Sequence, residues 1–339
     1  MEAKAVSALP ADAGWQFEPK WDGFRCLAFR NADKIELRAK SGKSLSRYFP
    51  EVLAALSELP VEQFVLDGEL TIPVGSTLSF DALQMRLHPA ASRINKLSIA
   101  TPAVLIVFDC LMDGQRTFLD APLIERRDAL ESWFDKLPKP GLLRLSPYTR
   151  NAAEARKWLQ RSGGALDGVI AKRLDGVYLP GERAMLKVKC KRTADCVVGG
   201  FRYESGGDEV GSLLLGLYNA QGKLDHVGFT SSIAKAERPA LTARLRKLLG
   251  PPGFTGDAPG GPSRWSTERS TQWEPLKSKL VVEVEYDHVS GDRFRHGTRL
   301  VRWRPDKSPR QCTFEQLERP TRPRTLVTKV LKQAIARTR

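Results

Sequence analysis

The sequence is poor in cysteine, and its cysteines form no recognisable pattern. There are five of them, none belongs to a C-x-x-C pair, and no histidine stands at metal-ligand spacing from them. These absences argue against a disulfide framework and against a cysteine-bound zinc site. We interpret all five as reduced thiols of a cytoplasmic protein. They are Cys26, Cys110, Cys190, Cys196 and Cys312.

Long apolar stretches are also missing. The longest uninterrupted one, residues 103–108, is far shorter than the roughly 20 residues that a membrane-spanning helix needs. The amino-terminal region holds no apolar block followed by a cleavage site. We therefore expect neither a membrane anchor nor secretion.

Acidic residues are in deficit: 39 Asp and Glu stand against 54 Lys and Arg. The resulting net charge of +15 favours a polyanionic partner such as nucleic acid, and in the cytoplasm this suggests association with the nucleoid. The hydrophobic share of 41% is sufficient for a folded core. At roughly 100 to 200 residues per domain, 339 residues indicate two domains.

The amino-terminal half mixes helices and strands without a regular alternation. Asn151 and Glu154 fit a capping box at the start of one helix, and Gly163-Gly164 would end it. Two further helices are expected at 50–59, which begins with proline, and at 123–136, with a charged outer face. This mixture predicts an α+β domain. Its strands are expected at 24–30, 35–38, 64–72, 103–111, 168–172 and 186–189.

The pattern changes after about residue 193, where strands separated by glycine-rich turns and one helix at 234–249 are expected. Five short strands with one helix suit a small β-barrel of the OB type. The stretch from Arg319 is basic and holds no Asp or Glu, so it is either a solvated tail or an extra arm on phosphates. The predicted domains are 1–192 and 193–318, with a basic tail at 319–339. The barrel strands are expected at 197–202, 212–218, 224–229, 280–286 and 298–302.

The densest cluster of reactive side chains lies at residues 18–25, which read E-P-K-W-D-G-F-R. A lysine must be neutral to act as a nucleophile, and an ordinary lysine is neutral in only about one molecule in 2,500 at pH 7. Neighbouring cations lower the lysine pKa, so Lys20 among other basic residues is a candidate nucleophile. Taken alone, such a run is more typical of a surface turn.

Four further clusters follow downstream in the order D-G-E (67–69), F-D (108–109), D-G-V-x-x-K (167–172) and K-V-K (187–189). The first places a carboxylate within an apolar strand, where an unpartnered charge is costly, so a cation or hydroxyl is expected beside it. In the last, strand alternation directs both lysines to one face. Each cluster alone has an ordinary structural explanation; the five in order are far less easily explained that way.

The five clusters together resemble the ATP-dependent DNA ligases of the covalent nucleotidyltransferase superfamily. Residues 20–25 match the K-x-D-G-x-R signature, and the family's sixth element, R-x-D-K, is present at 304–307. The resemblance extends over about residues 14–317 and is strongest to short bacterial ligases and to the ligase module of end-joining ligases. It implies a nucleotidyltransferase domain followed by an OB-fold domain.

The resemblance also implies a role for each matching residue. Lys20, within a signature that includes Asp22, would attack the α-phosphate of ATP to form a lysine–AMP bond. Glu69 and Asp167 would lie near Mg²⁺ or Mn²⁺, since hard oxygen ligands suit these ions. Arg304, Asp306 and Lys307 would swing in with the barrel to orient the departing pyrophosphate. The implied nucleotide contacts are Glu18 and Phe108 to adenine, Arg25 and Glu69 to ribose, Lys40 to ribose or a 5′-phosphate, and Lys172, Lys187 and Lys189 to the α-phosphate.

Three positions depart from the family pattern, one of them Met185, where an aromatic residue is often seen before the fifth element. Lys40 stands where an arginine is usual, which replaces a bidentate contact by a point charge, and Asp167 stands where glutamate is common. Three alternatives remain: an RNA ligase, a GTP-dependent capping guanylyltransferase, and an inactive nucleic-acid-binding OB protein. The expected partners are ATP and nicked duplex DNA, with a monomeric enzyme and possible repair-protein partners.

Overall fold

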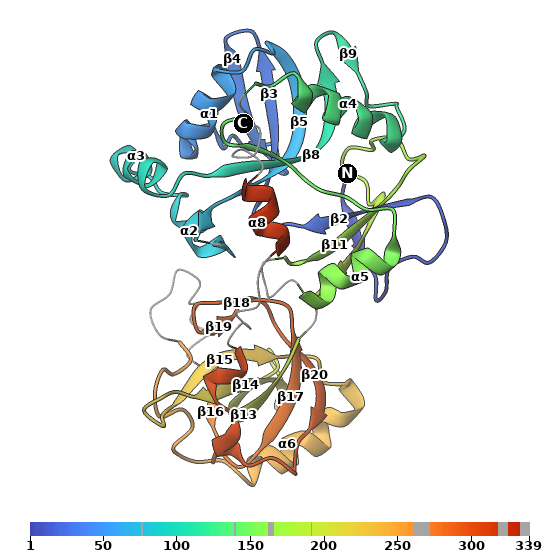
Figure 1. Ribbon diagram of the computed structural model, residues 1–339. Helices are drawn as coiled ribbons and strands as arrows, with labels where there is room; N and C mark the ends of the chain where they lie inside the picture. The colour runs from blue at the N-terminus through green and yellow to red at the C-terminus, as the bar shows by residue number, and fades with distance from the viewer. Residues whose placement is uncertain are drawn as a thin grey trace. The chain divides into compact units, whose positions relative to one another are not determined.

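The computed structural model describes residues 1–75, 77–138, 140–161, 166–190, 192–260, 272–317 and 325–332. The chain divides into two compact units: Met1–Cys190 with Pro320–Arg339, and Lys191–Arg319 (Figure 1). The chain therefore leaves the first unit, builds the second and returns to the first. The boundary near residue 190 lies close to the expected one, whereas the expected separate tail is grouped with the first unit. Among the helices in these ranges, none is both long and apolar enough to span a membrane.

The first unit contains two central β-sheets. The larger has the strand order β10-β8-β5-β3-β4, with β9 (Arg116–Thr117) paired to β8, and all its pairings are antiparallel except β10 with β8. Its strands are β3 (Phe24–Asn31), β4 (Lys34–Ala39), β5 (Gln63–Thr71), β8 (Val104–Asp113) and β10 (Leu143–Leu145). The smaller sheet has the order β1-β12-β11-β2. Its strands are β1 (Ala3–Ala5), β2 (Trp15–Lys20), β11 (Gly168–Arg173) and β12 (Met185–Lys189).

Helices α1 (Pro50–Ser57) and α4 (Leu123–Asp135) contribute to the core of the larger sheet, and both confirm expected elements. Trp133 of α4 is fully buried, with its ring 5.1 Å from that of Phe64 on β5. The charged face expected for α4 is only partly exposed, because Arg126 and Arg127 are buried. Helices α2 (Phe80–Met85) and α3 (Ala91–Ala100) and the short pair β6 (Pro73–Val74) and β7 (Thr77–Leu78) were not expected.

Helix α5 (Ala152–Arg161) begins at the cap that the sequence predicts. The Asn151 side chain accepts hydrogen bonds from the backbone N–H groups of Ala153 (2.8 Å) and Glu154 (3.3 Å). In a capping box the Glu154 side chain would accept a hydrogen bond from the Asn151 N–H. Here the Thr149 hydroxyl accepts from that N–H and donates to the Glu154 carboxylate at 2.7 Å. The helix start is thus satisfied by three side chains.

The second unit is built on a sheet of order β15-β14-β13-β17-β20, with β16 (Glu274–Pro275) paired to β13 and with a separate pair β18 (Val289–Ser290) and β19 (Arg293–Phe294). Its two edges meet: Thr298, just before β20, donates its N–H to Phe229 O on β15 at 3.0 Å. This closure and the sheet-rich content agree with the OB type. The strands are β13 (Arg192–Tyr203), β14 (Val210–Tyr218), β15 (Leu224–Thr230), β17 (Val281–Tyr286) and β20 (Arg299–Trp303).

The helix expected at 234–249 is shorter in the structure. It consists of a 3₁₀ turn at Lys235–Glu237 followed by α6 (Arg238–Arg246), with Pro239 in its first turn. Leu241 and Leu245 of α6 are buried in the core of the second unit.

The carboxy-terminal helix α8 (Thr325–Lys332) belongs to the first unit. In Figure 1 it appears in red among the blue-to-green elements of that unit. Val327 and Val330 on α8 are buried in one apolar cluster with Trp21, Leu78 and Ile106. The part of the expected basic tail that forms α8 is therefore neither fully solvated nor extended.

Candidate active site

One pocket of the first unit brings together most of the predicted nucleotide-binding residues. Both sheets contribute to it, through strands β1, β2, β3, β5, β8, β11 and β12. Of the residues expected to bind nucleotide, all but Lys189 line it, and Lys20 lines it as well. The lining consists of Glu2, Ala3, Glu18, Pro19, Lys20, Trp21, Arg25, Lys40, Glu69, Phe108, Ile170, Lys172, Met185 and Lys187.

Lys20 is the last residue of β2 and lies beside Asp167. Its Nζ forms an ion pair and hydrogen bond with Asp167 Oδ2. The backbones are joined as well, because the Asp167 N–H donates to Lys20 O at 2.9 Å. Lys20 was expected to lie among cations, whereas its direct partner is the carboxylate of Asp167, a residue expected near the metal ion.

Two glycines of the recognised clusters permit this close approach. A Cβ on Gly168, which has a φ of +152°, would lie 2.1 Å from Val188 O on the neighbouring strand. A Cβ on Gly23 would lie 2.2 Å from Leu70 O. Neither distance is sterically possible, so any side chain at these positions would push the strands apart. The glycine of each D-G pair is therefore required by the close packing against Leu70 and Val188.

Glu18 and Lys172 form a buried ion pair on adjacent strands. Lys172 Nζ lies 2.8 Å from Glu18 Oε2, and Gln16 Nε2 donates to Glu18 Oε1 at 2.8 Å. Lys172 Nζ also lies 4.7 Å from the centre of the Phe108 ring, within cation–π range. The structure therefore places Lys172 beside the two residues expected to hold adenine, and its expected contact with the α-phosphate stays a prediction.

Arg25 and Asp67 form the second charged pair of the pocket. Arg25 Nε donates to Asp67 Oδ1 at 2.9 Å, and its guanidinium lies 5.4 Å from the Phe108 ring centre. The Tyr178 hydroxyl donates to Asp67 at 2.7 Å. Burial alone would raise the pKa of Asp67, but Arg25 outweighs it and the pKa lies below its ordinary value. The expected cation and hydroxyl partners of the D-G-E cluster are both confirmed, although Asp67 and Tyr178 were not predicted as site residues.

A fully buried ion pair supports this arrangement from α4. Arg126 Nε donates to Asp109 Oδ1 at 2.8 Å and Arg126 Nη2 donates to Oδ2 at 3.2 Å. Lys172 Nζ lies 3.8 Å from the same carboxylate. The second residue of the F-D cluster thus serves as an anchor between α4 and β11. Arg126 was missed because a charge on a helix normally suggests an exposed face.

Glu69 is half-buried and lines the pocket. Burial raises its pKa to about 8, although Lys20 and Arg25 act in the opposite direction. Across the described ranges, no group of three or more His, Cys, Asp or Glu side chains is arranged to hold a metal ion. Mg²⁺ is usually bound by one or two carboxylates together with substrate phosphates, so Glu69 and Asp167 fit an ion that arrives with a nucleotide.

Of the three remaining predicted lysines, Lys40 and Lys187 line the pocket and Lys189 does not. Lys40 is exposed and pairs with Glu2 at 2.7 Å. Burial lowers the pKa of Lys187, and the neighbouring Lys20 and Lys189 lower it further. Lys187 lies opposite Ile170 in the β11–β12 register, and Lys189 lies opposite Gly168. The strand alternation thus keeps both β12 lysines near Lys20, as expected. Asp22 follows Lys20 in the bend before β3 and does not line the pocket.

The R-x-D-K residues belong to the second unit and form their own network. Arg304 Nη1 donates to both oxygens of Asp195, at 2.9 and 3.0 Å, and Lys307 Nζ donates to Asp195 Oδ2 at 2.6 Å. Arg304 Nη2 donates to Asp306 at 2.8 Å. Asp195 is buried on β13 and was not predicted. A carboxylate in an apolar strand, the signal that identified the D-G-E cluster, is present there too.

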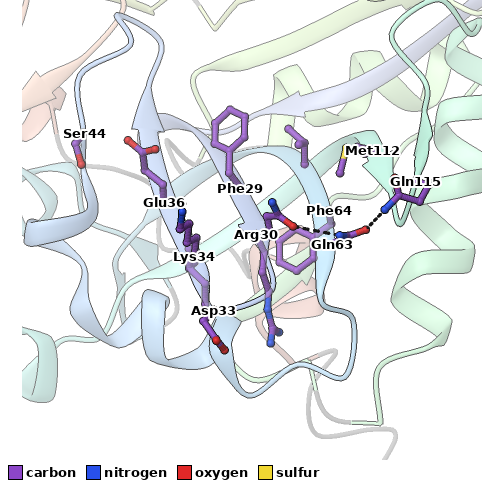
Figure 2. Close-up of a pocket in the computed structure, with 13 residues that line it drawn as sticks. Phe29, Arg30, Asp33, Lys34, Glu36, Ser44, Gln63, Phe64, Met112 and Gln115 are labelled. Carbon is purple, nitrogen blue, oxygen red and sulfur yellow. Dashed lines mark hydrogen bonds between the residues drawn. The ribbon is translucent and has the colours of Figure 1, made fainter.

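Figure 2 shows a different hollow, at the ends of strands β3, β4, β5 and β8 of the larger sheet, which is lined by none of the predicted residues. Its amides bond to one another: Gln115 Nε2 donates to Gln63 at 2.6 Å, and Gln63 Nε2 donates to Asn31 at 3.1 Å. Arg30 donates to the carbonyls of Leu56 and Leu59, at 2.8 Å each. None of the predicted site residues lines this hollow, so the Lys20 pocket is the candidate active site.

Comparison with known proteins identifies the family. The family described as ATP dependent DNA ligase domain matches residues 3–189, and that described as ATP dependent DNA ligase C terminal region matches residues 206–307. DNA ligase C1 of Mycolicibacterium smegmatis is 46% identical over 333 residues, which cover 94% of this chain and 93% of that protein. The multifunctional non-homologous end joining DNA repair protein LigD of Mycobacterium tuberculosis is 29% identical, over 91% of this chain and 38% of its own length.

A solved structure from a study of Lig E DNA ligases shares the fold, with a TM-score of 0.55 at 16% identity over 90% of this chain and 100% of that one. The family matches cover both units, and they contain every cluster from which the site was predicted. The chain thus belongs to the ATP-dependent DNA ligases.

Proposed function

We propose that this ligase seals nicks between a 5′-phosphate and a 3′-hydroxyl in duplex DNA, through lysine–AMP and DNA–adenylate intermediates. The observation that carries the proposal is the Lys20 pocket. It contains the Lys20 amine, the Phe108 ring, two charged pairs and further lysines. Together these groups suit an adenine, a ribose and a triphosphate. The net charge of +15 supports a polyanionic second substrate.

The first step forms one bond and breaks one. The neutral Lys20 Nζ attacks the α-phosphorus of ATP, a phosphorus–nitrogen bond forms, and the bond to the departing pyrophosphate breaks. Lys187 and Lys189 are placed to stabilise the charge that develops on the α-phosphate. In the second step, a 5′-phosphate oxygen of the nick displaces Lys20 from AMP. In the third, the 3′-hydroxyl attacks the 5′-phosphate and releases AMP.

The remaining residues have supporting roles in the proposal. Phe108 stacks on adenine, Glu18 accepts from its amino group, and Arg25 with Glu69 contacts the ribose. Lys172 reaches the nucleotide through Glu18 and Phe108, and Lys40 contacts the ribose or a 5′-phosphate. Glu69 and Asp167 would hold the Mg²⁺ or Mn²⁺ that accompanies ATP, which would supply positive charge to the phosphates. Asp22 acts together with the other residues of the K-x-D-G-x-R signature. Arg304, Asp306 and Lys307 orient the departing pyrophosphate.

The biological setting is also a proposal. We infer a monomeric enzyme that acts on nicked DNA in the cytoplasm, close to the nucleoid. A repair role is supported by the name of the relative LigD, which refers to end joining and DNA repair. Repair proteins are therefore candidate partners.

The test is incubation with α-labelled ATP or GTP and Mg²⁺, followed by denaturing electrophoresis and a chase with nicked duplex DNA. We expect a labelled band from ATP, discharged by the nick with formation of sealed product. Lys20→Ala should give no band while still sealing a nick that is already adenylated. Persistent labelling of that variant would exclude Lys20 as the nucleophile. A band from GTP would indicate capping, discharge only by RNA would indicate an RNA ligase, and DNA binding without any band would indicate an inactive OB protein.

A further inference from the structure

The carboxy-terminal helix α8 shares one apolar cluster with the residues next to Lys20 and Asp167 in the sequence. The apolar cluster that receives Val327 and Val330 also contains Trp21 and Leu166, with Trp21 only 4% exposed. Trp21 follows Lys20 in the sequence, and Leu166 precedes Asp167. The helix therefore contacts the cluster that holds the chain on both sides of the ion pair.

The position of Trp21 is fixed by two kinds of contact. Its indole Nε1 donates to the Ser146 hydroxyl at 3.0 Å, while its ring lies within the apolar cluster. A buried aromatic side chain held by both packing and a hydrogen bond has little rotational freedom. Because Trp21 and Lys20 share a peptide bond, a shift of the indole moves the backbone that carries the amine.

The other face of α8 is polar, which fixes how the helix docks. Lys329 and Lys332 are exposed, whereas Val327 and Val330, three residues apart, share the buried face. A polar contact completes the docking, because Arg144 Nε donates to the carbonyl of Leu331 at 3.3 Å. An eight-residue helix is marginal on its own, so α8 depends on this surface for its order.

We propose that α8 is a positioning element for the adenylation step: it holds Trp21 and Leu166 so that Lys20 and Asp167 keep the geometry needed for attack on ATP. The proposal rests on the proposed function, because it assigns Lys20 as the nucleophile. It predicts that loosening α8 slows the chemistry without weakening ATP binding, since Glu18, Phe108 and Lys187 lie outside the α8 cluster. Misplacement of a reacting group by about 1 Å can cost roughly 100-fold in rate.

The experiment uses the full chain with Val330→Asn, with Lys329→Asn on the exposed face as the matched control. Label transfer from ATP is followed over a range of ATP concentrations, at a temperature well below the melting temperature of each variant. For Val330→Asn we expect the rate at saturating ATP to fall at least about 10-fold, with the ATP concentration for half-maximal rate changed less than about 2-fold. Lys329→Asn should match the unmodified enzyme, and Val330→Ile should recover most of the rate.

Two results would overturn the proposal. An unchanged rate for Val330→Asn would show that α8 only covers the surface. If Val330→Asn changed the rate and the ATP requirement together, and Val330→Ile behaved in the same way, the effect would be a general packing defect rather than a loss of positioning. Failure of the proposed function is distinguished by Lys20→Ala, because continued labelling of that variant rejects the nucleophile whatever α8 does.

Discussion

Arg304 is held by Asp195 through two hydrogen bonds, at 2.9 and 3.0 Å, from a single guanidinium nitrogen. The same carboxylate accepts a hydrogen bond from Lys307 at 2.6 Å. One buried acid thus contacts both cations of the R-x-D-K element, while Asp306 accepts further hydrogen bonds from Arg304. Charge-assisted hydrogen bonds of this kind contribute about 1.5 to 3 kcal/mol each.

We expect Asp195→Asn to slow label transfer from ATP by about 10-fold, because the cations lose the charge that orients them. Arg304→Ala and Lys307→Ala should slow that step more strongly. Sealing of a nick that is already adenylated should change less than about 2-fold in all three variants. Rapid-quench measurement of both steps checks this. An Asp195→Asn variant that labels normally would show that the cations are oriented without the carboxylate.

The two pocket lysines of β11 and β12 should respond differently to substitution. Lys187→Met should lower the labelling rate at saturating ATP by about 100-fold, because it removes a fixed cation near the reacting phosphate. Lys172→Met should mainly raise the ATP concentration needed, because it leaves Glu18 buried without its cation. The measurement is the dependence of label transfer on ATP concentration. A Lys172→Met variant with a normal ATP requirement and a low maximal rate would instead support the α-phosphate contact that the resemblance implies.

Among the ion pairs of the first unit, the buried Asp109–Arg126 pair should contribute most to the free energy of unfolding. Arg126→Leu should lower the free energy of unfolding by about 3 to 5 kcal/mol, since it leaves a buried carboxylate that retains only the more distant Lys172. Arg116→Leu is the matched control, because the Arg116–Glu125 pair is exposed at 3.7 Å and should change stability by less than about 1 kcal/mol. Urea unfolding measures both. Equal effects would mean that burial does not control the strength of these pairs.

His226 should make the second unit sensitive to acid. Burial lowers its pKa to about 3, with further lowering by Arg293 and Arg202, whereas the unfolded chain binds the proton near pH 6.5. Its contribution to stability is therefore complete above pH 6.5 and is lost as the pH falls toward 3. Between pH 6.5 and 5 the loss is about 2 kcal/mol. Melting of the unmodified protein and His226→Phe across this range checks the prediction. Identical pH profiles would contradict it.

Much of the fold was predictable because the main signals are local. A proline start identified α1, a helix cap identified α5, the pattern with a charged outer face identified α4, and the apolar runs identified β3, β5, β8 and β11. The predicted site residues mostly line one pocket, since they occupy neighbouring strands of two sheets. Metal coordination and the individual nucleotide contacts stay predictions.

The missed features depend on contacts between distant parts of the sequence. Arg126 and Asp195 are ordinary charged residues until the fold brings Asp109 and Arg304 to them. Helix α8 is short and its apolar face lies within a basic, proline-containing stretch, so its periodicity alone is weak. Its receiving surface is formed by residues such as Trp21, about 300 positions earlier in the chain. No local pattern specifies such a pairing.

The return of the chain to the first unit has a consequence for synthesis on the ribosome. Strand β2 and Trp21 emerge early, but the residues of α8 that complete their apolar cluster emerge only after the whole second unit has been made. Domains ordinarily fold in order as they leave the ribosome. Here the second unit can finish folding first, while the surface behind Lys20 stays partly uncovered in the nascent chain. The apolar cluster next to the proposed nucleophile can therefore be completed only after residues 325–332 have been synthesised.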